Sequence, residues 1–416
     1  LEHDGAIVFW MNTFFHFELT INILNLLKSH KAGAKVRRFS RFAKFFFDYF
    51  CFHADCFRKI AYLCTHKTIN DMKEKVFLLA LMLFCGMQVA EAKKKVAPDY
   101  AIGFYNLENL FDTCHDAGKN DYEFLPDGGY QWTGEKYVHK LHNLSRVLSE
   151  LGTDQVPAVG CAAIGVAEVE NAGCLRDLCN EAPLKARGYQ FVHIEGPDQR
   201  GIDCALLYQP SLFTIRNLAL VPYIYKLPED SLRATRGFFV VSGTLADEHV
   251  TIIVNHLPSR GATSYYREEG GRQLRAVKDS LLRDDPDVKL IIMGDMNDDP
   301  QDASMAECLG AKRELSEVGQ GDLYNPWWNE LASGNGTLQY QGAWNLFDQI
   351  ILSQSLLIGG GQTPSLSYCG HQVFRRPYLI QQSGPYRGNT LRTHAGGQWL
   401  NGYSDHLPTV VYLIKN

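Results

Sequence analysis

The stretch IIMGDMNDDP, residues 291–300, places an apolar run directly before a cluster of carboxylates and an amide. Leu290–Met293 predicts a buried strand, because a short, continuous apolar run fits a strand that is covered on both faces. The polar residues after it could form an exposed turn, cap a helix or bind a positively charged ligand. The residues that follow the other strands distinguish these alternatives.

Short apolar runs of the same kind recur along the chain. They predict further strands over residues 101–105, 162–167, 205–208, 238–241, 250–254, 347–352 and 407–412. Apolar residues at helical spacing predict helices over 137–151 and 266–283. Because strands both alternate with helices and follow one another directly, we expect a mixed sheet pair flanked by helices. Residues 354–402, rich in Gly, Ser, Gln and Arg, are typical of long surface loops.

The segment MKEKVFLLALMLFCGMQVAEAKKK begins at Met72 and has the pattern of a secretory signal peptide over residues 72–92. Lys73 and Lys75 precede an apolar run, and the Ala-Glu-Ala sequence at residues 90–92 fits a cleavage site. A buried or membrane-spanning helix is the alternative, but this run is shorter than the roughly 20 residues that a bilayer requires. We therefore expect an exported protein, periplasmic or secreted, without stable membrane insertion after cleavage.

Residues 1–71 are rich in Phe and show no sustained helical or strand period. We interpret them as an upstream translation artefact or disordered extension, with a small Phe-rich domain as the alternative. After residue 92 the sequence contains no Pro/Ser-rich linker, repeat or low-complexity tract. We therefore expect one domain over residues 93–416, acting as a monomer.

The composition limits how the protein can bind its ligands. The chain has 416 residues, 45% apolar content and a formal net charge of −5. It therefore lacks the basic field that holds polyanions nonspecifically, and a phosphate substrate would need local arginines or metal ions. No cysteine pair after residue 92 has CxxC spacing, which disfavours a zinc finger or a redox motif. Cys161 and Cys204 lie in apolar runs, as core cysteines do.

Oxygen-rich residues and histidines recur where the predicted strands end. They occur in YNLEN (105–109), AEVEN (167–171), NHLPSR (255–260), GDMNDDP (294–300) and YSDHLP (403–408). Each alone is most often a turn or a helix cap. Strand ends of a layered fold share one edge, so together they predict one site. Carboxylates without cysteine suit Mg²⁺ or Mn²⁺, and histidines with carboxylates suit acid–base chemistry.

These motifs, together with RGIDCALLY (200–208) and FDQIILS (347–353), resemble the endonuclease/exonuclease/phosphatase superfamily over residues 101–412. That family includes deoxyribonuclease I-like enzymes, sphingomyelinases and inositol polyphosphate 5-phosphatases. The resemblance implies an α/β (α+β) four-layer sandwich, with two mixed, mainly antiparallel sheets face to face and helices outside. It also implies hydrolysis of phosphate esters with a divalent metal, Mg²⁺ or Mn²⁺.

The resemblance implies roles for residues on the metal side of the site. Glu168 matches the main metal-binding carboxylate, Asn106 lies beside that metal, and Asp405 is a further ligand. His406 matches the general base that activates the attacking water. Asp348 matches the carboxylate that orients His406.

The resemblance also implies roles on the substrate side. Asp295 and Asn297 match the pair that contacts the phosphate and the nucleophile or leaving oxygen, and His256 matches a phosphate-contacting histidine or general acid. Asp203 is expected to orient His256. Arg260 is expected to bind phosphate, with solvated surface charge as the alternative.

The function that follows is an exported, metal-dependent phosphodiesterase, most simply a nuclease acting on nucleic acid. A phosphomonoesterase or a hydrolase of phospholipid or inositol-phosphate headgroups is the alternative on the same scaffold, and an inactive binding module is a third. Trp327, Trp328, Trp344 and Tyr340 could stack on nucleic-acid bases or pack beneath a loop.

Overall fold

The structure, a computed structural model, describes residues 97–357 and 364–415. The chain divides into two compact units, Leu1–Lys95 and Val96–Asn416, and the described residues belong to the second. The expected signal peptide and the segment before it lie outside the described residues.

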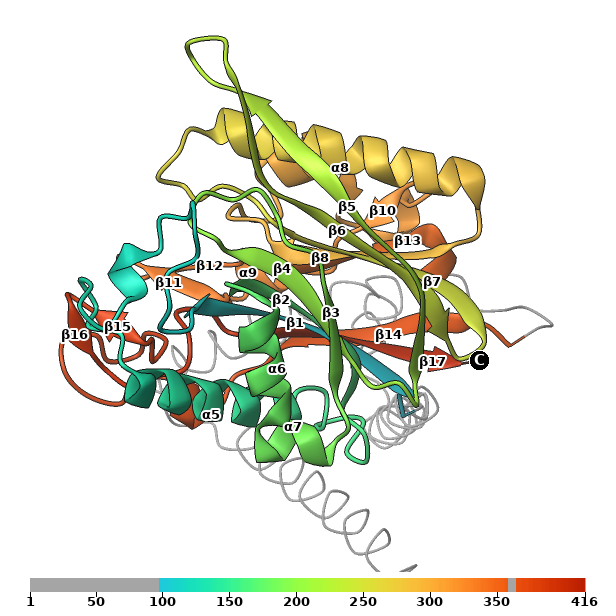
Figure 1. The fold of residues 1–416 in the computed structure, drawn as a ribbon. Coiled ribbons are helices and arrows are strands. Elements are labelled where there is room, and N and C mark those ends of the chain that lie inside the picture. Colours follow the sequence, from blue (N-terminus) through green and yellow to red (C-terminus); the bar gives the residue numbers. More distant parts are fainter. Residues whose placement is uncertain (1–96, 358–363, 416) are drawn as a thin grey trace, which may run out of the picture. The chain divides into compact units, whose positions relative to one another are not determined.

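Two mixed sheets form the centre of the domain (Figure 1). The first has the strand order β14-β17-β1-β2-β4-β3, and the second has the order β5-β6-β7-β8-β13-β10-β9. The pairs β1–β2, β7–β8 and β9–β10 are parallel, and the other neighbours in these two sheets are antiparallel.

The strands of the first sheet are β1 (Tyr100–Leu110), β2 (Cys161–Val169), β3 (Gln190–His193), β4 (Asp203–Tyr208), β14 (Leu366–Val373) and β17 (Thr409–Lys415). Those of the second are β5 (Phe213–Lys226), β6 (Leu232–Leu245), β7 (Glu248–His256), β8 (Lys289–Asp295), β9 (Ala311–Lys312), β10 (Leu323–Tyr324) and β13 (Asp348–Ser353). Two small hairpins complete the strands: β11 (Leu338–Tyr340) with β12 (Ala343–Asn345), and β15 (His394–Ala395) with β16 (Gln398–Trp399).

The helices lie outside the sheets. Those longer than a single turn are α5 (Gly134–Glu150), α6 (Ala172–Asn180), α7 (Ala182–Ala186), α8 (Ser264–Asp284), α9 (Trp328–Ala332) and the π-helix η3 (Ser304–Leu309). Figure 1 shows α8 along the second sheet and α5, α6 and α7 beside the first. Thr133 caps α5 by accepting a hydrogen bond from the backbone N–H of Lys136, which explains where that helix begins.

Strand alternation produces the layers. Odd-numbered residues of β8, such as Ile291 and Met293, pack in the core between the two sheets, whereas Leu290 and Ile292 pack in the core beneath α8. A third core joins α5, α6 and α7 to the first sheet. A Cβ built on Gly165 would lie 2.4 Å from the sulfur of Met293, so glycine allows the two sheets to approach here.

The four-layer sandwich of mixed sheets is confirmed, and each predicted strand and helix overlaps an observed one. The prediction of long surface loops over 354–402 is wrong in part, because β14 is a full strand of the first sheet that pairs with β17. Trp327 is fully buried and its indole N–H donates to the carbonyl of Ile350, so it packs as a core residue. Within the described residues, the helices are too short or too polar to span a bilayer.

Candidate active site

Three expected site residues lie side by side where three neighbouring strands of the second sheet end or begin, and we call this end of the strands the site edge. His256 ends β7, Asp295 ends β8 and Asp348 begins β13, and Asp295 is in register with both of its neighbours. Asp295 has the same parity as Ile291 and Met293, so it continues the row that faces the core between the sheets. The carboxyl end of a strand and the amino end of its antiparallel neighbour share one edge, which brings the three side chains together.

Asn106 and Glu168 reach this edge from the first sheet through irregularities in β1 and β2. The β1–β2 register shifts after Asn106, and the β2–β4 register shifts between Ala167 and Val169. Glu168 has φ 62°, a left-handed conformation typical of a bulge that redirects a side chain. The amide Nδ2 of Asn106 lies 3.4 Å from Glu168 Oε1 and 3.0 Å from Asp295 Oδ2, so it links the two sheets.

His406 and Asp348 form a buried dyad. Nδ1 of His406 lies 2.7 Å from Oδ2 of Asp348, and both side chains are almost fully buried. The backbone N–H of His406 donates to Ser404 Oγ, whose hydroxyl donates to the carbonyl of Asn106. Because Asp348 accepts the Nδ1 proton, Nε2 of His406 is left free, 3.7 Å from Asp295 Oδ2.

The two site histidines have opposite electrostatic environments. Burial favours the neutral form of His406, but Asp348, Asp295 and Asp405 together outweigh it and hold the pKa of His406 well above its ordinary value. Burial lowers the pKa of His256 well below its ordinary value, and nearby positive charges lower it further. One imidazole therefore favours its charged form and the other its neutral form, a separation that suits different roles in acid–base chemistry.

The oxygen atoms at this edge fit a hard divalent cation. Glu168, Asp295 and Asp405 contribute carboxylates, the ligand type that Mg²⁺ and Mn²⁺ prefer. Burial raises the pKa of Asp295 to about 7; His406 opposes this rise, whereas Asp348 and Glu168 add to it. A bound cation would stabilise the charged form of these crowded carboxylates, so the residues present fit such an ion.

Asp405 is held by Arg392, a residue that the motifs did not reveal. Arg392 donates from Nη2 to Asp405 Oδ2 at 2.7 Å and from Nε to Glu108 Oε1 at 3.2 Å. Glu108 Oε2 accepts the backbone N–H of Thr393 and lies 3.8 Å from Nζ of the fully buried Lys140. The sequence pointed to Lys140 only through its position, since a lysine directly before Leu141 lies on the apolar face of a helix. It did not point to Arg392, because Arg392 lies in an irregular segment.

The expected contact between Asp203 and His256 is wrong. Asp203 Oδ2 lies 3.0 Å from Nε2 of His193, and its carboxylate also accepts the backbone N–H of Gly196. Nδ1 of His256 is buried and has no hydrogen-bond partner within the described residues. Nε2 of His256 instead lies 3.6 Å from Asp295 and 3.7 Å from Glu168. Asp203 begins β4 in the first sheet, whereas His256 ends β7 in the second, and sequence order does not reveal which of the two sheets a strand joins.

The polar cluster of the stretch 291–300 divides between two tasks. The backbone N–H of Asn297 donates to Asp295 Oδ1, and its amide donates to the carbonyl of Leu257, which keeps Asn297 at the site. The next carboxylates belong to the turn and pair with Arg260. Its guanidinium lies within 3.3 Å of Asp298, Asp299 and Asp302. The charge of Arg260 is therefore compensated by the protein, contrary to the expectation of an arginine available to phosphate.

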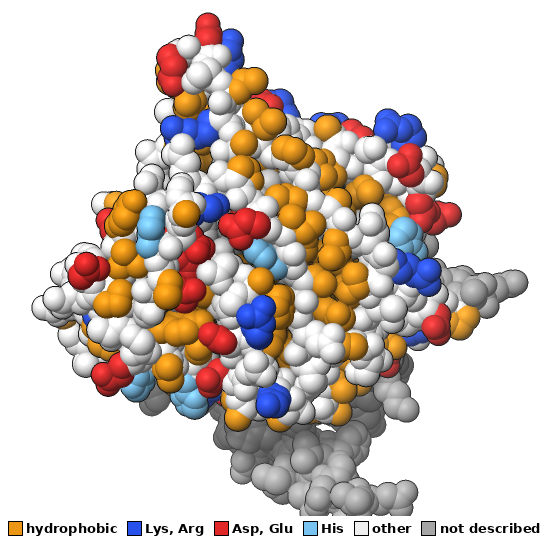
Figure 2. Space-filling model, in the orientation of Figure 1, with side chains coloured by type: hydrophobic (Ala, Val, Ile, Leu, Met, Phe, Trp, Pro, Cys, Tyr) orange, Lys and Arg blue, Asp and Glu red, His pale blue; other side chains and the backbone are white. Residues whose placement is uncertain are grey.

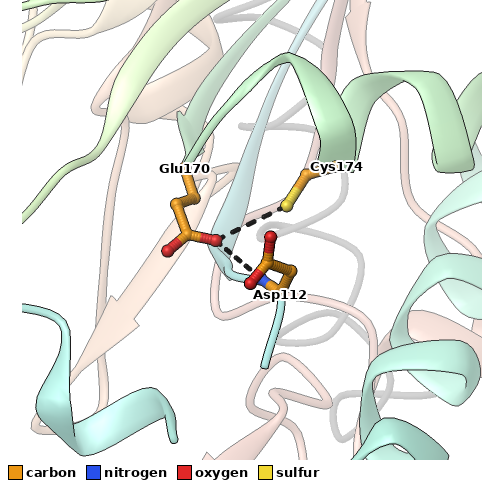
Figure 3. Close-up of side chains that lie close together, drawn as sticks. All are labelled: Asp112, Glu170 and Cys174. Carbon is orange, nitrogen blue, oxygen red and sulfur yellow. Dashed lines mark hydrogen bonds between the residues drawn. The ribbon is translucent and has the colours of Figure 1, made fainter. Parts of the chain in front are cut away.

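A second cluster lies where β1 and β2 end (Figure 3). Glu170 Oε2 accepts the backbone N–H of Asp112 at 2.7 Å and lies 3.7 Å from Cys174 Sγ. In Figure 3 the other oxygen of Glu170 points away from Asp112 and Cys174. These contacts fasten the start of α6 to the end of β1.

Several solved structures are similar to this chain at low sequence identity. The mannosyl-6-phosphatase Bt3783 of Bacteroides thetaiotaomicron VPI-5482 is 16% identical, with 76% of this chain and 100% of that chain covered and a TM-score of 0.47. The human Nocturnin catalytic domain is 16% identical, with 77% and 96% covered and a TM-score of 0.44. TDP2 of D. rerio, complexed with a single-strand DNA product, is 15% identical, with 76% and 98% covered and a TM-score of 0.44. Likeness at this level carries no argument about substrate.

A search of curated proteins found no match. A family model, by contrast, matches almost the whole described domain. Residues 101–415 match the endonuclease/exonuclease/phosphatase family. The chain therefore belongs to this family of divalent-metal-dependent phosphoester hydrolases.

Proposed function

We propose that the protein is an exported nuclease, a Mg²⁺- or Mn²⁺-dependent phosphodiester hydrolase with His406 as its general base. The observation that carries this proposal is the buried dyad of His406 and Asp348, whose free Nε2 faces Asp295 and Asp405. Export is supported by the signal-peptide pattern that begins at Met72.

In the reaction, His406 Nε2 takes a proton from the attacking water while Asp348 holds the Nδ1 proton and stabilises the imidazolium. The carboxylates that raise the pKa of His406 include Asp295 and Asp405, which also lie among the expected cation ligands. Positive charge at those carboxylates would weaken their effect on His406. The imidazole would then be neutral near pH 7, as a base requires.

Glu168, Asn106, Asp295 and Asp405 would hold the divalent cation. When bound, it supplies Lewis-acid stabilisation of the negative charge that develops on the phosphate oxygens. His256 is kept neutral by burial, so its imidazole can hydrogen-bond a phosphate oxygen without pairing permanently with a carboxylate. The amide of Asn297 is held by its hydrogen bond to the carbonyl of Leu257, where it can contact the same phosphate group.

A phosphomonoesterase, or a hydrolase of phospholipid or inositol-phosphate headgroups, is the second candidate. The observation that favours it is the charge distribution. On the face drawn in Figure 2, the Lys and Arg side chains of the described residues are scattered among Asp and Glu. With a net charge of −5, the chain offers no extended basic track for a nucleic-acid backbone.

One assay series tests both candidates. The purified protein is incubated with Mg²⁺, Mn²⁺ or a chelator and offered plasmid DNA, RNA, inositol phosphates and sphingomyelin. Metal-dependent cleavage of DNA or RNA that is lost in His406→Ala supports the nuclease. Cleavage confined to inositol phosphates or sphingomyelin selects the second candidate, and no metal-dependent turnover contradicts both. N-terminal sequencing of the exported protein tests cleavage after Ala92.

A further inference from the structure

Arg200 lies at the rim of the site, beside the residues expected to bind metal and phosphate. Its guanidinium Nη2 donates to the side-chain oxygen of Asn109. The backbone N–H of Asn109 donates in turn to Glu168 Oε2 at 3.0 Å. The guanidinium also acts electrostatically on His256, whose pKa it helps to lower. Arg200 therefore lies near both Glu168 and His256, and it forms no ion pair with the carboxylate of Glu168.

Arg200 differs from the other arginines around the site because no carboxylate of the described residues lies within ion-pair distance of its guanidinium. The others are compensated by the protein: Arg236 pairs with Asp198, Arg260 with Asp298, Asp299 and Asp302, Arg267 with Asp298, and Arg392 with Glu108 and Asp405. Arg200 is also exposed, so a ligand can reach its charge.

The loop that carries Arg200 is held from several sides. The backbone N–H of Arg200 donates to Asp198 Oδ1 at 2.9 Å. Asp198 is itself buried and accepts a hydrogen bond from Thr235 at 2.9 Å. Gly201 follows with φ +80°, a conformation that favours glycine and sets the turn direction. Preorganisation of this kind lowers the entropy lost when a side chain binds an anion.

We propose that Arg200, and not Arg260, is the arginine that binds the substrate's phosphate group, acting beside His256. A guanidinium matches two oxygens of one phosphate, and its positive charge would balance an anion brought next to Glu168, Asp295 and Asp405. The ligand class is a phosphate with at least two non-bridging oxygens. This assignment rests on the proposed function for its catalytic meaning, but anion binding itself can be measured without turnover.

Isothermal titration calorimetry of inorganic phosphate against the Mg²⁺-loaded full-length protein tests the proposal. The variants are Arg200→Gln and Arg200→Lys, with Arg283→Gln as the matched control. Arg283 is exposed, bonds Ser280 Oγ and lies in the last turn of α8, which begins near the site edge and ends at the opposite edge of the second sheet. Hydrolysis of whichever ester the wild type cleaves is measured in parallel, with KM and kcat separated.

Arg200→Gln should weaken phosphate binding by roughly 10- to 100-fold, the loss expected for a hydrogen bond between charged groups. Arg200→Lys should recover part of the affinity, and Arg283→Gln should match the wild type. Phosphate affinity in Arg200→Gln within threefold of the control overturns the proposal. A melting temperature that falls together with affinity, with no recovery by lysine or added guanidinium, also overturns it. If the wild type binds phosphate through Arg200 but hydrolyses nothing, the proposed function fails and the binding assignment stands.

Discussion

Replacing Asp348 with Asn tests the buried dyad directly. The side-chain volume barely changes, but the charge that lies 2.7 Å from His406 Nδ1 is removed. A positioned general base contributes about 10²–10⁴-fold to rate, which corresponds to roughly 3–5 kcal/mol of activation free energy. An asparagine amide can also donate to Nδ1 and leave the proton on Nε2, which removes the base. We therefore expect kcat to fall by about 10²- to 10⁴-fold.

The same substitution should also shift the pH dependence of kcat in a defined direction. Asp348 raises the pKa of His406, so Asp348→Asn lowers it. The neutral base then becomes available at lower pH, and the rising limb of kcat against pH moves toward acid while the plateau falls. The assay is a pH–rate profile with saturating Mg²⁺, with Asp203→Asn as the control because Asp203 contacts His193 instead. A plateau within threefold of the wild type, with an unmoved midpoint, would refute the dyad's role.

Three further outcomes are expected. Glu168→Gln should weaken Mg²⁺ binding by roughly tenfold or more, because a charged ligand is lost; unchanged affinity by calorimetry contradicts the cation assignment. Burial among aromatic rings lowers the pKa of His394 to about 4. Below about pH 6.5 the unfolded chain therefore binds a proton on this imidazole that the folded chain does not bind. The free energy of unfolding consequently decreases as the pH decreases. After allowance for partial exposure, urea unfolding should show the wild type losing about 1–2 kcal/mol more than His394→Gln between pH 7 and pH 5, and equal losses would contradict this. Trp327→Ala should cost about 3–5 kcal/mol of unfolding free energy, while the exposed Tyr340→Ala should change it by less than about 0.5 kcal/mol; equal effects would show that Trp327 is not a core residue.

Eight of the 13 strands in the two large sheets were predicted from the sequence, because a strand buried on both faces is a continuous apolar run. The runs ending at Met293 and Leu352 are of this kind, and each became a central strand. β14 was missed because its sequence, LSYCGHQV, mixes polar and apolar residues, and it is fixed mainly by pairing with β17. Its strand conformation depends on a partner distant in sequence, which local pattern cannot supply.

The site residues themselves were readable because their chemical types recur at strand ends. Their partners were not. Asp203 bonds His193, and Arg260 is surrounded by three carboxylates of the following turn, although both residues stand in motifs that fit a phosphate site. Arg200 opens the RGIDCALLY motif, and nothing in that motif shows that its charge lacks a partner. Which arginine keeps an uncompensated charge depends on every carboxylate within about 4 Å, and that is a property of the packed chain.

The sequence alone determined the family, the sheet sandwich and the chemical types of the site, because apolar runs and strand-end motifs are local features. Within IIMGDMNDDP, the alternation of a strand already separates Asp295 from the carboxylates of the following turn. It directs Asp295 toward the same face as Ile291 and Met293. Only the tertiary structure decided which side chains meet. The bulge at Glu168 and the register of three strands bring residues more than a hundred positions apart within a few ångströms, and pKa values and ion pairs depend on those distances.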